Sequence, residues 1–230
     1  MHVSIVIDPS ALFAGRVFLA YTCVKGVSVA RGLRDADEFL RRAEEQAREM
    51  YSLDKLKDHP TVRALRDFYW RIGIDPTKQR PASEALARRV LRGRSLPRIN
   101  NVVDAGNAVS LITLVPIGIY DLDRIRGELV LREAREGEAF RPIGGAVERL
   151  RERQIVLADS EKILHVFPYR DSVDTMVRKE TENVLVVACG VEGIDEELVI
   201  KAARMTGDAI SRLAGGTMSE VRVAKPSQPR

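Results

Sequence analysis

A chain of 230 residues can bury a substantial hydrophobic core, and its 45% hydrophobic and 30% charged residues are ordinary for a soluble globular protein. No apolar run reaches the roughly 20 residues that a membrane-spanning helix requires. Asp8 and Arg16 interrupt the start of the chain, so it does not have the form of a signal peptide. We therefore expect a cytoplasmic protein without membrane contact. The formal charge of +4 permits an anionic partner such as RNA but does not require one.

The composition also bears on metals and growth temperature. Cys23 and Cys189 lie far apart in apolar surroundings, which favours buried thiols over metal ligands. His2, His59 and His165 are scattered without metal-ligand spacing, so we expect no metal and no other cofactor. Arginine supplies most of the positive charge and amides are few. This suits the ion-pair networks of a thermophilic source, although genome composition can produce the same bias.

The N-terminal part of the chain contains strand patterns first and helix patterns after them. The predicted elements are strands at 3–7 and 16–24, and helices at 35–50, from Pro60, and from Ala82 or Ser83 to Gly93. In residues 35–50 acidic groups precede basic ones, which suits a solvated helix and its dipole. The aromatic residues at 68–70 can be interpreted as a base-stacking platform. Their helical spacing favours packing in the core instead.

A polar face runs through the apolar segment that follows. Four polar side chains recur there at spacings of three and four residues: Asn100, Asn101, Asp104 and Asn107. They share one face if residues 100–111 form a helix. Buried polar groups cost free energy unless they are paired, so these side chains must bond neighbouring backbone, each other or a ligand. This helix is therefore a candidate site.

After this helix the hydrophobic period changes to that of strands. Residues 115–120 contain Pro116 and Gly118 and lead into a turn at 121–123. Strands are predicted at 127–134, 154–157, 163–167 and 184–188. The last is continuously apolar, as a central strand would be. Asp195 begins a final helix, which ends at Gly215 and Gly216.

The predicted fold class is α+β: a helical N-terminal half leads into a mixed or antiparallel sheet, and a C-terminal helix closes it. We expect a single domain over residues 1–216. It divides into N-terminal strands and helix at 1–58, a core at 59–190 and the closing helix at 191–216. Residues 217–230 are polar, contain two prolines and are expected to form a disordered tail.

Short catalytic motifs give little guidance, because no nucleophile elbow, Walker loop, dinucleotide fingerprint or metal motif is present. What remains is a set of polar residues beside glycines, which allow a ligand to approach the backbone closely. Its members are Arg132, Gly137, Glu138, Gly144, Gly145, Asp159, Tyr169, Arg170, Asp171, Ser172, Thr175, Thr181 and Glu182. Each also has a structural explanation. For example, Gly137 and Glu138 can form a tight turn between strands.

A basic run lies just before the polar helix and contains Arg88, Arg89, Arg92, Arg94 and Arg98. A solvated helix face is the ordinary explanation for such a run. The functional alternative is an edge that contacts phosphates beside the pocket. The two explanations can hold for different arginines.

Four motifs occur in order between residues 60 and 188: the NNVVDAGN helix, the PIGIYDLD turn, the LREAREGEAF strand and turn, and a segment from Asp171 through Thr175 and Glu180 to Thr181. Together they resemble the B3/4 domain of the phenylalanyl-tRNA synthetase beta chain, in its free-standing form. Tyr169, Arg170 and Asp171 stand where the synthetase version has a glycine-rich loop. The amino acid that would be recognised is therefore left open.

The resemblance implies an editing module that binds the aminoacylated end of tRNA and hydrolyses a mischarged ester. It implies catalytic roles for Asn101, Asp104 and Glu138. Substrate binding would involve Asn100, Asn107, Arg132, Gly137, Gly144, Gly145, Tyr169, Arg170, Thr181 and Glu182. RNA binding would involve Arg92, Arg94 and Arg98. The chain has no ATP-binding signature, so it should not charge tRNA itself.

Two other function classes remain open. One is a module that binds RNA or an amino acid without hydrolysis, and the other is a small-molecule hydrolase or sensor. For the site itself, we expect Asp104 and Asn107 to meet Gly137 and Glu138 at one pocket. We expect Asp104 and Glu138 to be functional, with an ion pair between Glu138 and Arg132 as the structural alternative.

Overall fold

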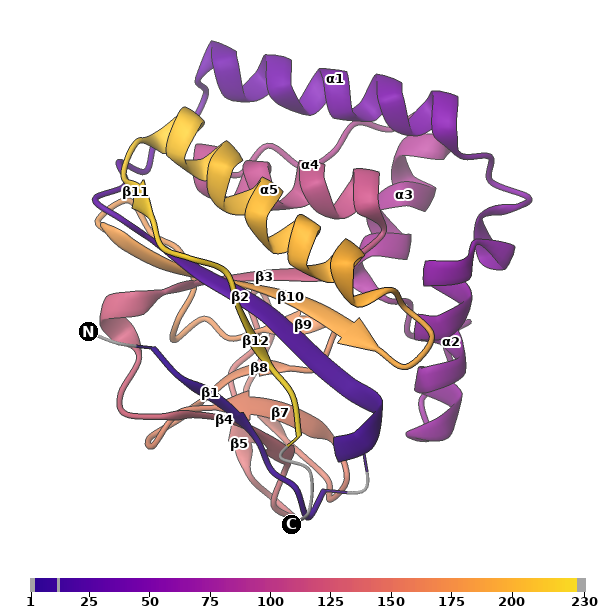
Figure 1. Cartoon of the computed structure of the whole chain (residues 1–230), viewed down its shortest axis with the longest axis vertical. Helices are drawn as coiled ribbons and strands as arrows, with labels where there is room; N and C mark the ends of the chain where they lie inside the picture. The colour runs from indigo at the N-terminus through magenta and orange to yellow at the C-terminus, as the bar shows by residue number, and fades with distance from the viewer. Residues whose placement is uncertain (1–2, 12, 227–230) are drawn as a thin grey trace.

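The computed structural model describes residues 3–11 and 13–226, and at its centre is a five-stranded sheet covered on one face by helices (Figure 1). The strand order is β11-β2-β10-β3, with β12 also paired to β2. β10 (Asn183–Val191) lies between β2 (Val17–Lys25) and β3 (Ile117–Asp121) and is antiparallel to both. All of β10 after its first residue is buried, so the prediction of a central strand at 184–188 is confirmed.

The helices form a layer over this sheet. α4 (Asn101–Thr113) packs against α5 (Glu196–Ala214), α1 (Arg34–Met50), α3 (Ala82–Leu91) and β3. Because most residues of α4 are buried, its polar side chains must find partners inside the protein. The predicted helix ends are also confirmed: Asp195 caps α5, and Gly93 follows α3 with a φ of +80°.

α2 (Pro60–Arg71) contacts β10. Phe68 and Tyr69 are buried in the core, as predicted for the aromatic cluster, but Trp70 is 57% exposed. Three consecutive residues turn through about 200° around a helix, so they cannot all face the core. The prediction that the aromatic cluster packs in the core is therefore wrong for Trp70.

A second five-stranded sheet lies beyond the first and has the order β1-β4-β7-β8-β9. Its strands are β1 (Ile5–Ile7), β4 (Leu129–Glu133), β7 (Ile155–Ala158), β8 (Ile163–Val166) and β9 (Arg170–Asp171). β1 is parallel to β4 and the other pairs are antiparallel, so this sheet is mixed. Leu131 and Leu157 share one core cluster with Leu19 and Val187 of the first sheet. The α+β prediction is confirmed, with two sheets where the sequence indicated one.

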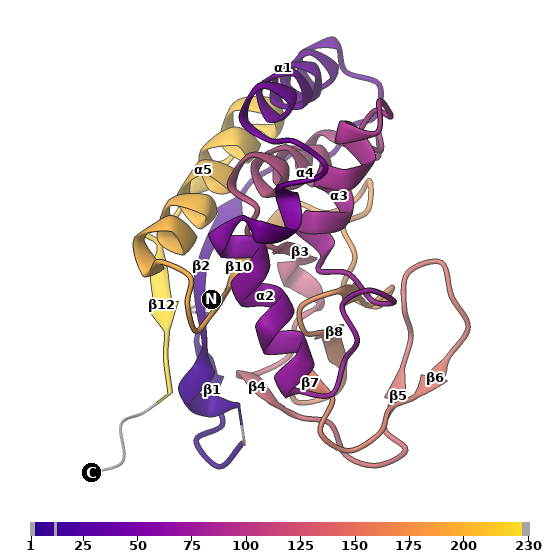
Figure 2. The same cartoon turned by 90° about the vertical axis from the view of Figure 1, so that its right-hand side faces the viewer.

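A two-stranded hairpin extends from the second sheet and stands away from the rest of the protein (Figure 2). It consists of β5 (Ala139–Phe140) and β6 (Glu148–Arg149). The remaining helical elements are short 3₁₀ turns: η1 (Ala14–Arg16), η2 (Leu56–Asp58) and η3 (Leu122–Arg124). None of the helices in the described part of the chain is long and apolar enough to cross a membrane.

The segment after α5 corrects the prediction of a disordered tail. β11 (Thr217–Met218) and β12 (Arg222–Ala224) both pair with the outer edge of β2. The hydroxyl of Ser219, which lies between β11 and β12, accepts from the Cys23 N–H of β2 (3.0 Å) and adds a further bond to this edge. Pairing satisfies backbone groups that an open sheet edge would leave unpaired. Residues 227–230 and His2 lie outside the described residues.

Candidate ligand-binding site

The polar face of α4 serves mainly structural hydrogen bonds. Asn100 caps the helix, because its side chain accepts from two backbone N–H groups of the first turn (3.1 and 2.9 Å). The Asn101 side chain accepts from the Ala30 N–H (2.9 Å) and donates to the carbonyls of Ser28 and Leu213 (both 3.0 Å). These bonds join α4 to the segment before α1 and to the end of α5. Both amides are therefore occupied by the fold.

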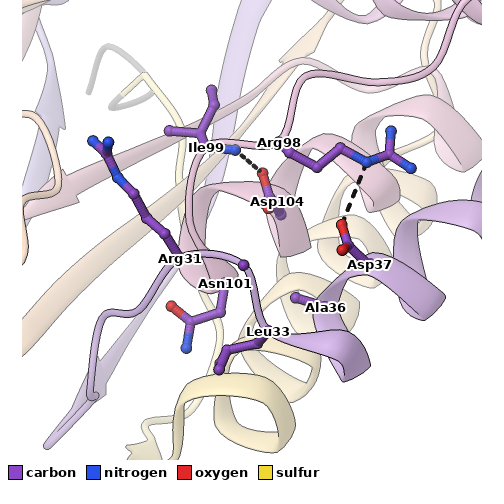
Figure 3. A pocket seen from close by; sticks show the side chains of 9 residues that line it. Arg31, Leu33, Ala36, Asp37, Arg98, Ile99, Asn101 and Asp104 are labelled. Carbon is purple, nitrogen blue, oxygen red and sulfur yellow. Dashed lines mark hydrogen bonds and ion pairs between the residues drawn. The ribbon is translucent and has the colours of Figure 1, made fainter.

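Asp104 lines a pocket of about 240 Å³ between α4 and the start of α1 (Figure 3). Its Oδ1 accepts from the Ile99 N–H (2.9 Å), and across the pocket Arg98 Nε lies 3.5 Å from Asp37 Oδ1. Burial raises the pKa of Asp104, while the Ile99 N–H and the charge of Arg98 lower it. Asp104 thus closes the turn that leads into α4. Asn107 is half-buried on the same helix and does not line this pocket.

The structure does not bring Asp104 and Glu138 together. α4 covers the first sheet, whereas Glu138 immediately precedes β5 in the hairpin beyond the second sheet, and the two elements lie far apart in both views (Figures 1 and 2). The expected shared pocket is therefore wrong. The sequence pattern could not show that Asp104 and Glu138 are far apart, because it did not indicate that the strands form two sheets.

Glu138 instead forms the ion pair that was the structural alternative. Both of its oxygens accept from the Arg132 guanidinium (2.9 and 2.6 Å), and one also accepts from the Arg135 N–H (3.0 Å). The bond to Arg132 is the main reason that the pKa of Glu138 is lowered. Gly137 adopts a φ of +74° in this turn, a conformation that favours glycine. The Gly137-Glu138 turn thus has a complete structural explanation.

A small recess of about 40 Å³ opens where β3, β8, β9 and β10 meet the first residue of α3. Three of its side chains form one hydrogen-bonded chain. The Tyr120 hydroxyl donates to Asp171 Oδ1 (3.1 Å) and also bonds His165 Nδ1. Tyr120 and His165 are 1% and 2% exposed, so the recess reaches a polar group deep inside the protein. We call Tyr120, His165 and Asp171 the buried triad; its third member, Asp171, lies at the partly exposed end on β9.

Gly118 makes room for this arrangement. Gly118 and Tyr120 are two residues apart on β3 and therefore point to the same face of the sheet. A Cβ atom at Gly118 would lie 1.9 Å from the Tyr120 hydroxyl oxygen, which is far too close for any side chain. The position of the Tyr120 hydroxyl therefore depends on a glycine at residue 118.

Burial controls the charges of the buried triad. It lowers the pKa of His165 to about 3, so this imidazole is neutral at pH 7. If Nδ1 donates to the Tyr120 oxygen, then Nε2 is an acceptor, and Nε2 has no hydrogen-bond partner among the described residues. Burial raises the pKa of Asp171 to about 6, against the opposing effect of its bond from Tyr120. It also raises the pKa of the Cys189 thiol, which lines the recess. At pH 7 the buried triad therefore carries one charge, the Asp171 carboxylate.

Two further residues predicted from the sequence lie at the recess, and two predicted glycines lie in the hairpin loop. Tyr169 and Arg170 line it, and Arg170 Nη1 donates to both oxygens of Glu148 on β6 (2.7 and 2.8 Å). A Cβ atom at Gly145 would lie 3.5 Å from Arg170 Nη2, so the hairpin loop passes beside this guanidinium. Gly144, in the same loop, has a φ of +74°. The hairpin is thus tied to the recess through Arg170.

The other predicted substrate-binding residues lie elsewhere. The Thr181 hydroxyl donates to Asp121 Oδ2 (2.7 Å) in the buried turn after β3. Glu182 is exposed, and its backbone carbonyl accepts from the Val27 N–H (2.8 Å). Neither side chain lines the recess or the Asp104 pocket.

The arginine run divides between two places. A groove of about 450 Å³ along α3 is lined by Arg80, Arg88, Arg89, Arg92 and Arg94. The buried Glu84 binds Arg88 (2.6 Å), and the Ser95 carbonyl accepts from Arg89 (2.5 Å). The other three arginines are exposed and have no ion-pair partner among the described residues. Arg98 lines the Asp104 pocket and binds Glu44 (2.6 Å).

Sequence reasoning did not select Tyr120 or His165, and it included Asp171 only in a broad set of polar residues. One signal was available: His165 is the single polar residue in the apolar strand pattern at 163–167. A second was the Gly118-x-Tyr120 spacing on a strand. Neither pattern identifies the third member, because Asp171 comes from a different strand.

The model of the B3/4 domain family matches residues 64–218, more than half of the chain. The chain belongs to the B3/4 domain family. The family region of this B3/4 protein includes every residue that lines the recess and the arginine groove. The resemblance seen in the sequence motifs is thereby confirmed.

Curated relatives of this B3/4 protein are phenylalanine–tRNA ligase beta subunits. That of Carboxydothermus hydrogenoformans is 31% identical over 140 residues, which is 60% of this chain and 17% of the relative. That of Protochlamydia amoebophila is 30% identical over 123 residues, which is 53% of this chain and 15% of the relative. The matched part is thus a small fraction of each ligase subunit.

A solved structure shows the same fold. An N-terminal fragment of the phenylalanyl-tRNA synthetase beta subunit from Pyrococcus horikoshii matches with a TM-score of 0.51 and 18% identity. The match covers 95% of this chain and 50% of that fragment. The fold shared with this fragment therefore extends over nearly the whole protein, beyond the residues 64–218 that the family model matches.

Proposed function

We propose that this protein binds the aminoacylated 3′ end of tRNA and hydrolyses a mischarged aminoacyl ester in trans. The recess would take the part of the aminoacyl group nearest the ester, and the arginine groove would contact the phosphates. The B3/4 family and its relation to phenylalanine–tRNA ligase beta subunits support tRNA as the partner.

The observation that carries this proposal is the position of α3. Its first residue, Ala82, lines the recess, and residues from its later turns line the arginine groove. A helix of 10 residues is roughly 15 Å long, so the two places are about one short helix apart. An acyl group in the recess thus leaves the adjoining nucleotides within reach of Arg80, Arg92 and Arg94. Cationic side chains without protein partners are the usual contacts of nucleic-acid phosphates.

The chemistry requires little from the protein. An aminoacyl ester is already activated, so holding its carbonyl beside a water molecule supplies much of the rate enhancement. The first N–H groups of α3 have no partner within the helix, and such groups stabilise an oxyanion that develops nearby. Water adds to the carbonyl carbon, and the bond to the ribose oxygen breaks. The ribose hydroxyl then leaves with a proton.

The residues expected to be catalytic take other roles in this proposal. Asn101 and Glu138 stabilise other parts of the fold through the bonds described above, and neither lines the recess. Asp104 closes the turn before α4 and lies outside the recess. We propose that none of the three contacts the ester.

The test is a panel of correctly charged and mischarged aminoacyl-tRNAs, incubated with and without the protein. We expect faster release of the amino acid from some members, with the tRNA left intact. Saturable tRNA binding without faster release would assign the protein to the class of binding modules. Neither binding nor release with any member would overturn the proposal.

A further inference from the structure

We propose that Asp171 binds the α-ammonium group of the acyl residue, so that the site requires a free amine next to the ester. This inference rests on the proposed function, because it names the part of the aminoacyl group that the recess recognises. The side chain of the amino acid would lie outside the recess.

The carboxylate of Asp171 has no cationic partner in the described part of the chain. Its Oδ1 accepts from Tyr120 (3.1 Å), and no ion pair involving its carboxylate occurs among the described residues. The neighbouring Arg170 is held by Glu148 instead. The other titratable groups that line the recess are the side chains of Tyr120, Tyr169, His165 and Cys189. None of these supplies a positive charge at pH 7, so a cationic ligand would complete the site.

The walls also suit an ammonium group. Tyr120 and Tyr169 line the recess, and tyrosine faces attract cations. His165 Nε2 adds an unpartnered acceptor to the buried triad. The N-terminus of α3, whose first residue Ala82 lines the recess, favours partial negative charge, such as that of an ester carbonyl. An α-amino ester carries its ammonium nitrogen three bonds from its carbonyl oxygen, so one small group presents both charges to the recess.

The volume of the recess limits which ligands can enter it. A cavity must offer about 10–15 Å³ to hold one water molecule. A recess of about 40 Å³ therefore admits an ammonium group and its carbon but no large side chain. The recognised feature is therefore common to all amino acids. N-acylated esters, which have lost the positive charge, and α-hydroxy esters, which never had it, should be excluded.

The first arm of the test uses two small probes that differ only in this group. Glycinamide carries the ammonium group and a neutral carbonyl, and glycolamide has a hydroxyl group in place of the ammonium. In NMR titrations of the whole protein at pH 7, glycinamide should shift the His165 imidazole and Ala82 amide signals, and glycolamide should not. Asp171→Asn should abolish the glycinamide response. Asp67→Asn, which changes an exposed acid on α2, should leave it unchanged. Equal responses to both probes, or a full response in Asp171→Asn, would overturn the proposal.

The second arm compares aminoacyl-tRNA with α-hydroxyacyl-tRNA of the same side chain. We expect turnover of the hydroxy ester to be lower by at least about tenfold, as for loss of one partner of a desolvated charge pair. Equal turnover would refute ammonium recognition while leaving the proposed function in place. A glycinamide response in a protein that neither binds nor hydrolyses any aminoacyl-tRNA would support the ammonium site and refute the proposed function.

Discussion

Replacement of Asp171 by asparagine should stabilise the protein at neutral and alkaline pH. Asparagine keeps an oxygen that accepts from Tyr120 and removes a partly buried charge. The pKa of Asp171 rises from its usual value of 3.8 to about 6 on folding, so the folded state holds its proton more tightly than the unfolded state. The stability that this proton contributes is fully present below about pH 4. It is lost as the pH rises through 6.

The magnitude follows from the size of the shift. A rise from 3.8 to about 6 is roughly two units, and each unit corresponds to 1.36 kcal/mol. The ionised carboxylate therefore costs up to about 3 kcal/mol above pH 7, less whatever solvent screens at the mouth of the recess. For a chain of this length, 1 kcal/mol changes the melting temperature by about 2–4 °C. We expect Asp171→Asn to melt higher than the parent at pH 8, by at most roughly 6–12 °C, and at the same temperature at pH 4.

The assay is thermal unfolding of the parent and the variant between pH 4 and pH 8. His165 has the opposite effect, because its lowered pKa makes folding more favourable as the pH rises through its usual value. Comparing variant with parent at each pH removes this contribution, since both contain the histidine. Asp67→Asn is the matched control and should follow the parent throughout. A variant that is less stable at pH 8, or a difference that does not depend on pH, would refute the burial of an unpaired charge.

Three further predictions concern other parts of the site. Gly118→Ala should cost about 1–3 kcal/mol of stability and displace Tyr120, because the new Cβ overlaps its hydroxyl; Gly15→Ala, where a Cβ meets nothing within 4 Å, is the control for the melting measurements. Glu138→Gln should lower the free energy of unfolding by about 1–3 kcal/mol while deacylation per folded molecule stays normal; normal stability with lost activity would restore the functional role expected from the sequence. Replacing Arg92 and Arg94 with alanine should weaken binding to all tRNAs alike and reduce its salt dependence, because phosphate contacts carry no sequence information. The exposed Arg34 and Arg41 of α1 provide a control with the same charge change, and a loss confined to one tRNA would show that Arg92 and Arg94 read sequence.

The pH 8 stabilisation of Asp171→Asn and its loss of glycinamide binding should occur together. A carboxylate kept at a cost in stability is expected where a ligand supplies its counter-charge. Arg132 and Glu138 show the contrary case, because their charges are satisfied within the protein. Removal of the charge should therefore raise stability at Asp171 and lower it at Glu138.

Local patterns were sufficient to predict the individual elements. A helix at 100–111 and a central strand at 184–188 were predicted from periodicity and apolar runs, and the structure has α4 at 101–113 and β10 at 183–191. The capping role of Asn100 was not predicted, because the sequence pattern placed this residue inside the helix. The ordered motifs were sufficient for the B3/4 family. These signals lie within short stretches of chain, so they can be read without knowing which stretches meet.

The grouping of residues into sites depended on long-range contacts. Asn101 looked like a ligand-binding amide, but its partners Ser28 and Leu213 are 73 and 112 residues away along the chain. Tyr120 and His165 were overlooked for the same reason, since they are 45 residues apart and meet only where the two sheets pack together. The sequence by itself determined the helices, most of the strands and the family. Only the tertiary structure decided which polar groups were already paired, because pairing depends on which distant segments the sheets bring side by side.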